Sequence, residues 1–121
     1  MADRLIIVLA GADPTLPEAL VSPLSLATVA AAMEYEVEIV ITGRSAPLAR
    51  RGVAAALQVP GGSCSVQALI QEARNAGVAV KVCVPAPGLD DDDLIAEIDE
   101  TVGAAYLISE AMDDATVTLT Y

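Results

Sequence analysis

Short apolar runs alternate along this chain with segments of helical character, and this alternation constrains the fold more than any other feature. Strands are predicted at residues 4–10, 37–42, 78–84 and 116–121. The first of them, rich in Leu, Ile and Val, is typical of a strand covered on both faces. Helices are predicted at residues 17–35, 47–57, 64–76, 90–100 and 102–112. This order predicts a three-layer α/β/α sandwich with a mainly parallel sheet of four to five strands, the fifth being short.

The size and composition of the chain predict one domain that forms oligomers. Its 121 residues suffice for a single core, so we expect one domain spanning residues 1–121. Apolar residues make up 55% of the chain and charged residues only 19%. One small core cannot bury all of these apolar side chains, and the simplest use of the remainder is a subunit interface. We therefore expect a homo-oligomer.

The charge of the chain excludes two classes of partner. Its 17 acidic and 6 basic residues give a net charge of −11, which would repel a nucleic acid or an anionic membrane. No apolar run reaches the ~18 residues needed to span a bilayer. Asp3 interrupts the basic flank of a signal peptide, so the beginning of the chain is interpreted as a strand. The sequence predicts a cytoplasmic protein with no nucleic-acid partner and no membrane span.

Three segments bring polar groups to the carboxyl edge of the predicted sheet, where the sites of parallel α/β domains gather. They follow the first three predicted strands and comprise residues 11–13, 42–45 and 83–88. We expect any chemistry to take place among these segments.

The residue types that the chain lacks exclude several classes of catalytic and metal-binding site. The chain has no His, which excludes a Ser–His triad, a His general base and the common His-containing zinc sites. Two Cys residues make a poor metal site, and the glycines match neither nucleotide-binding motif. The four aspartates at 90–93 begin a predicted helix, where negative charge suits the helix dipole, so we interpret Asp90 as a cap. No metal and no cofactor are expected.

The two cysteines are the only credible nucleophiles. Cys64 is predicted in the first turn of a helix capped by Ser63, where the helix dipole favours a thiolate, and Cys83 at the end of the next strand. The helix advances about 20 Å and the strand returns about 23 Å, so both thiols are predicted to face one cleft. Arg44, on a neighbouring segment of the edge, is a candidate to stabilise an anionic sulfur. The alternative is that both cysteines are small buried hydrophobic residues and that Arg44 is an ordinary loop residue.

Several motifs, taken in their order and spacing, resemble a known family. They are LIQEARNAGVAVKVC, then GLDDDDLIAEIDETVGAAYLISEA and a final strand, preceded by RLIIVLAGAD and VEIVITGRSAPLARRG. The chain resembles, over essentially its whole length, the DsrE/DsrF/TusD family of small sulfurtransferase-like proteins. The resemblance implies a DsrE-like domain in which a helix and a strand deliver a cysteine to the edge of the sheet.

The resemblance also implies a function. The family's cysteine accepts a sulfane sulfur as a persulfide and passes it to a partner protein, in sulfur oxidation or tRNA thiolation, and the matching position is Cys83. It implies a sulfurtransferase that acts in a relay, with the backbone near Gly88 and the side chain of Arg44 as candidates to hold the negative persulfide. Homo-oligomers in the family are trimers or hexamers, and the implied partners are a sulfur donor and a sulfur acceptor protein.

Two other functions remain open from the sequence. One is a non-catalytic oligomeric module that binds a small ligand or a partner protein at the edge of the sheet. The other is a redox protein in which Cys64 and Cys83 form a reversible disulfide, with Cys64 otherwise a secondary thiol of the relay.

Overall fold

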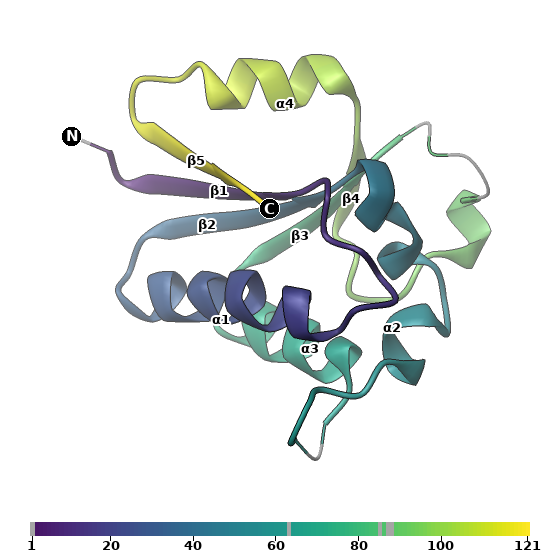
Figure 1. The fold of residues 1–121 in the computed structure, drawn as a ribbon. Helices are drawn as coiled ribbons and strands as arrows, with labels where there is room; N and C mark the ends of the chain where they lie inside the picture. Colours follow the sequence, from purple (N-terminus) through teal and green to yellow (C-terminus); the bar gives the residue numbers. More distant parts are fainter. Residues whose placement is uncertain (1, 63, 85, 87–88) are drawn as a thin grey trace.

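A five-stranded, all-parallel sheet forms the centre of the molecule (Figure 1). The computed structural model describes residues 2–62, 64–84, 86 and 89–121. The strand order is β4-β3-β2-β1-β5. The strands are β1 (Arg4–Leu9), β2 (Glu36–Ile41), β3 (Ala79–Cys83), β4 (Glu100–Val102) and β5 (Thr116–Thr120). The predicted parallel sheet is confirmed, and the short fifth strand is β4.

Helices cover both faces of this sheet and make it the middle layer of three (Figure 1). One face carries α1 (Glu18–Ala32) and α3 (Val66–Asn75), with α2 (Val53–Ala56) beside α3. The opposite face carries α4 (Ala104–Ala111). Two 3₁₀ helices, η1 (Gly43–Ala49) and η2 (Asp91–Asp93), lie in the connections. The predicted α/β/α sandwich is therefore confirmed.

The sheet separates two apolar clusters, because successive side chains of a strand point to opposite faces. On the side of α1 and α3, β1 contributes Ile7 and Leu9 to the larger cluster. On the side of α4, it contributes Ile6 and Val8 to a smaller one. All four side chains are buried, so β1 is covered on both faces as its continuous apolar sequence predicts.

The predicted helix at residues 47–57 is wrong, because η1 and α2 form there as two separate pieces. Gly52 precedes α2 with a φ of 91°, a conformation that favours glycine. The segment instead pairs with a later part of the chain. Arg50 forms an antiparallel bridge with Leu94, and the backbone N–H of Arg51 donates to the carbonyl of Asp93 at 2.6 Å. These tertiary hydrogen bonds outweigh the helical preference of the Ala-rich stretch.

The predicted helix at residues 90–100 is also wrong. Only the single turn η2 forms, Asp90 caps no long helix, and the segment ends in β4. Its backbone is satisfied by other elements: the N–H of Ile95 donates to Ala49 at 2.9 Å, and that of Asp99 to Val80 at 2.7 Å. Hydrogen bonds to η1 and to β3 therefore take the place of those that a helix would have supplied.

Candidate functional site

Cys83 is the last residue of β3 and is half-buried. Its side chain packs against the smaller apolar cluster, which is formed by Ile6, Val8, Val40 and Val102. The thiol therefore lies on the α4 side of the sheet, at the carboxyl end of its strand. Its position at that edge is where the sequence predicted it.

The start of α4 lies next to this cysteine. Cys83 pairs with Val102 across β3 and β4, and the backbone N–H of Val84 donates to the carbonyl of Val102 at 2.8 Å. Gly103 follows as the N-cap of α4, and no side chain in the described part of the chain caps this terminus. Free N–H groups and the positive end of the helix dipole thus follow directly on the residue that pairs with Cys83. Such groups can donate hydrogen bonds to an anion bound beside Cys83.

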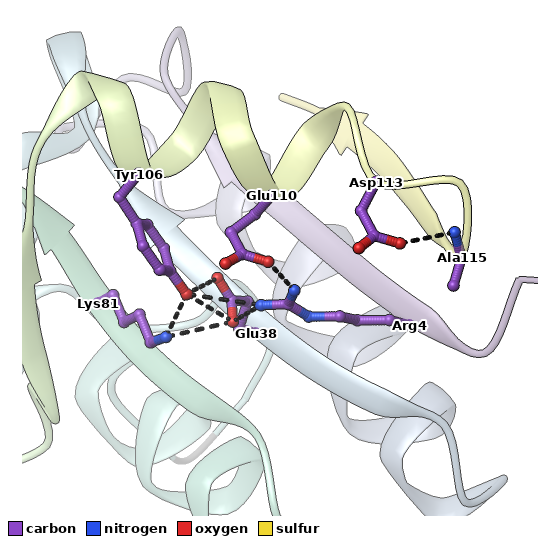
Figure 2. A network of polar contacts seen from close by, with 7 residues as sticks. All are labelled: Arg4, Glu38, Lys81, Tyr106, Glu110, Asp113 and Ala115. Carbon is purple, nitrogen blue, oxygen red and sulfur yellow. Dashed lines mark hydrogen bonds and ion pairs between the residues drawn. The ribbon is translucent and has the colours of Figure 1, made fainter.

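A network of polar side chains fills the space between the sheet and α4, centred on Glu38 of β2 (Figure 2). The Glu38 carboxylate accepts hydrogen bonds from Arg4 Nη2 at 2.6 Å, from Tyr106 Oη at 3.0 Å and from Lys81 Nζ at 3.3 Å. Lys81 also donates to Tyr106, and Arg4 also pairs with Glu110 of α4. Both ends of α4 are therefore tied to the sheet through ion pairs and hydrogen bonds.

The network keeps its members charged. Burial disfavours the ionised form of Glu38, but hydrogen bonds from Arg4 and Tyr106 and the nearby charges of Lys81 and Arg4 outweigh it, so the pKa of Glu38 lies below its usual value. Burial likewise opposes the charge of Lys81, but the Tyr106 hydrogen bond and the charge of Glu38 raise its pKa above the usual value. Lys81 is thus an ammonium at neutral pH.

Lys81 and Cys83 share the α4 side of β3, because they are two residues apart on one strand. The Cα atoms of the two residues are about 7 Å apart on this spacing of the backbone. Lys81 and Glu38 are not among the site residues predicted from the sequence. The sequence nevertheless contains a signal for both residues. Each is a charged residue inside a strand that helices cover on both faces, and such a residue requires a partner.

Two of the three predicted edge segments meet. The N–H of Arg44 donates to the carbonyl of Ala10 at 2.8 Å, and Ser45 Oγ donates to the carbonyl of Ala12 at 2.7 Å. Arg44 is exposed, and its charge acts on Asp13. The pKa of Asp13 is lowered first by hydrogen bonds from the side chain and backbone of Thr15 and then by Arg44. Arg44 is therefore at the predicted edge, with Asp13 as a neighbouring carboxylate.

Cys64 is not in the first turn of a helix. α3 begins at Val66, and its N-cap is Ser65, whose Oγ accepts from the N–H of Ala68 at 3.2 Å. The predicted cap, Ser63, lies outside the described residues. Cys64 lies in the loop between α2 and α3, where its carbonyl accepts from Val59 at 3.0 Å.

The structure does not bring the two thiols to one cleft. α2 and α3, which flank the loop that holds Cys64, lie on the side of the sheet opposite α4 (Figure 1). The side chain of Cys83 is on the α4 side. The length estimate placed both residues at one edge but did not distinguish the two faces of the sheet.

The remaining predicted site residues are placed as follows. Gly88 lies outside the described residues. Among the aspartates at 90–93, the carbonyls of Asp92 and Asp93 accept from Arg51, from its side chain at 2.8 Å and its N–H at 2.6 Å. In the described part of the chain, no three His, Cys, Asp or Glu residues are grouped so that they could hold a metal ion. No helix in the described ranges is long and apolar enough to cross a membrane.

Comparisons with known proteins agree with this architecture. A comparison with curated proteins finds no match. Among solved structures, the crystal structure of the ychN protein from E. coli has a TM-score of 0.74 to this chain and covers 100% of both chains, at 21% sequence identity. At that identity the likeness concerns the fold. A model of the DsrE/DsrF-like family matches residues 4–121, so this chain belongs to the DsrE/DsrF-like family.

Proposed function

We propose that this protein is a sulfur carrier that accepts a sulfane sulfur on Cys83 as a persulfide and passes it to a partner protein. The observation that carries the proposal is the position of Cys83, half-buried at the carboxyl end of β3 and paired with the residue before the N-cap of α4. Membership of the DsrE/DsrF-like family supports it. The protein acts in a relay, as a sulfurtransferase that needs a donor and an acceptor.

The proposed chemistry consists of two exchange steps. The Cys83 thiolate attacks the outer sulfur of a donor persulfide; the S–S bond of the donor breaks, the donor leaves as a thiolate, and a new S–S bond forms on Cys83. An acceptor thiolate then attacks the outer sulfur of the Cys83 persulfide. That bond breaks, the Cys83 thiolate is regenerated, and one sulfur atom has moved with no external oxidant or reductant.

Two features of the described site would stabilise the anionic forms of Cys83. The first turn of α4 offers backbone N–H groups and the positive end of a dipole. Lys81 offers an ammonium charge on the same face of β3. The sulfur of Cys83 is the nucleophile of the first step and the leaving group of the second, and in both steps these groups would stabilise its negative charge.

Arg44 and Gly88 remain proposed as further groups that hold the persulfide. η1, which contains Arg44, contacts β3 as well as β1 and β2. An exposed arginine on this element can turn toward a ligand at the carboxyl edge. We also propose that the protein works as a cytoplasmic homo-oligomer, either a trimer or a hexamer.

Mass spectrometry after incubation with a persulfide donor tests the proposal. The wild type should gain one sulfur atom on Cys83, and dithiothreitol should remove it. Cys64→Ser is the matched control and should gain sulfur as the wild type does, whereas Cys83→Ser should gain none. If Cys83 stays unmodified, and resists alkylation until the protein unfolds, the carrier function is wrong and a non-catalytic binding module takes its place.

A further inference from the structure

The two outer strands of the sheet differ in how they are protected. β4 is three residues long, begins with the exposed Glu100 and follows Asp99. Short length and acidic residues prevent such an edge from pairing with another chain. β5 is five residues long, with the sequence TVTLT, and contains no charge, no Pro and no Gly. No strand in the described part of the chain pairs with its outer edge.

The backbone of β5 offers hydrogen bonds on that outer edge. Tyr121 donates its N–H to Val8 at 2.8 Å, and its carbonyl accepts from Ala10. Because the direction of these groups alternates along a strand, the N–H and carbonyl groups of Thr116, Thr118 and Thr120 point away from β1. The N–H of Thr116 already donates to the carbonyl of Asp113 at 3.1 Å. The N–H groups of Thr118 and Thr120 and the three carbonyls can pair with an added strand.

The sequence of β5 reads the same by residue class in both directions about Thr118. In an antiparallel pair of two such strands centred on Thr118, Val117 lies opposite Leu119 of the second copy, and Thr116 lies opposite Thr120. Each pair joins like side chains, which stabilises a sheet. Thr118 would then face its own copy as a hydrogen-bonded pair. We propose that β5 pairs antiparallel with β5 of a second copy of this chain, across a two-fold axis through Thr118.

An apolar groove beside β5 supports the same partner. It has a volume of about 360 Å³. Its lining includes α1, the residues just before β2, and β5, through Leu26, Val29, Met33, Tyr35, Val117 and Leu119. Val29 and Met33 are 56% and 61% exposed, and Val117 is 46% exposed. In the proposed dimer a second β5 and a second α1 would cover these side chains, which removes apolar surface from water.

The charge of the groove identifies a second copy as a suitable occupant. The chain carries a net charge of −11, so most approaches of two copies are repulsive. None of the described residues that line the groove is acidic. The lining itself therefore brings no carboxylates together when two copies meet here. The proposal does not depend on sulfur transfer, and its two-fold contact occurs in a dimer or a hexamer but not in an isolated trimer.

The solution mass of variants tests the contact. Light scattering should show an oligomer for the wild type, and its mass should halve in Thr118→Pro and Leu119→Lys. Proline at 118 removes an outward N–H that the monomer does not use, and edge strands tolerate it. The matched control is Met112→Lys, which places the same charge at the C-cap of α4, at a residue that is 78% exposed and outside the groove. Circular dichroism should show that all three variants remain folded.

A cross-link tests the two-fold axis itself, because only a residue on the axis meets its own copy. In a background with Cys64→Ser and Cys83→Ser, Thr118→Cys should form a disulfide-linked dimer on mild oxidation, since paired strands bring Cα atoms within disulfide range. Thr101→Cys, on the outer strand β4, should not. A monomeric wild type, or an oligomer whose mass is the same in Thr118→Pro and Leu119→Lys, overturns the proposal. If Thr118→Pro and Leu119→Lys halve the mass but Thr118→Cys forms no disulfide-linked dimer, β5 is at the contact and the proposed two-fold axis through Thr118 is wrong.

Discussion

Lys81 Nζ lies 3.3 Å from the carboxylate of Glu38, across the pair formed by β2 and β3 and beneath α4 (Figure 2). The Glu38 side chain is only 6% exposed and also pairs with Arg4. This one carboxylate pairs with two partly buried cations, of which Arg4 also pairs with Glu110. Several properties of the protein should depend on this one side chain.

Glu38→Gln should lower the free energy of unfolding by about 3 kcal/mol, because it leaves Arg4 and Lys81 charged and partly buried with one anion fewer. Urea unfolding measures the change. Glu36→Gln is the matched control: it alters an exposed carboxylate at the start of the same strand and should change stability by less than about 0.5 kcal/mol. Equal effects of the two substitutions would show that the network contributes little.

The stability of the protein should fall in acid, because the pKa of Glu38 is lowered in the folded state. Its contribution is complete above the usual value of 4.5 and is lost as the pH falls through the lowered pKa. The raised pKa of Lys81 affects stability at alkaline pH. Its contribution is complete below 10.5 and is lost as the pH rises through the raised value.

Urea unfolding midpoints, measured from pH 2 to pH 11 on the wild type and on Glu38→Gln, test the loss of stability in acid and at alkaline pH. The difference between the two proteins should be largest near neutral pH and should shrink in acid, where Glu38 becomes protonated. A difference that stays constant across the acidic range would contradict the assigned ionisation of Glu38.

Tyr106→Phe should destabilise the protein by about 1 kcal/mol, because the Tyr106 hydroxyl donates to Glu38 and accepts from Lys81. Thermal unfolding gives the change. Tyr35→Phe is the control, since Tyr35 is 45% exposed and no described side chain bonds to its hydroxyl. If both variants melt at the wild-type temperature, the hydroxyl of Tyr106 does not tie α4 to the sheet.

Lys81→Met should slow the alkylation of Cys83 by about threefold at neutral pH, because it removes an ammonium charge that attracts an anionic sulfur on the same face of β3. The rate is measured against pH in a Cys64→Ser background. Arg74→Met removes a charge of the same sign from α3, where Arg74 pairs with Asp99, and should leave the rate unchanged. An equal decrease in both variants would point to net charge rather than to Lys81.

Ser65→Ala should cost about 1 kcal/mol, because it removes the side-chain cap of α3. Ser109→Ala, at an exposed position inside α4, should have no such cost, since Ala favours helix interiors. Equilibrium unfolding of the two variants compares them. A neutral Ser65→Ala would mean that α3 begins without help from this hydroxyl.

Local patterns in the sequence determined the elements whose apolar residues are compatible with only one kind of secondary structure and burial. The continuous apolar run of β1 predicted a strand covered on both faces, because only a sheet between two helical layers buries such a strand. The alternation of strands and helices determined the parallel sheet. The place of Cys83 at its carboxyl edge followed, because every strand of a parallel sheet ends at the same side.

The tertiary structure alone decided the conformation of the segments whose hydrogen-bond partners lie in distant parts of the chain. Residues 90–100 have a helical pattern, yet their backbone pairs with β3 and with Ala49, and no local rule contains those partners. The polar network likewise joins β1, β2, β3 and α4. The face on which each thiol lies depends on how the connections cross the sheet, which spacing along the chain does not specify. The sequence by itself thus determined the layers and the edge that carries Cys83, and only the packing of distant elements decided which charged groups surround it.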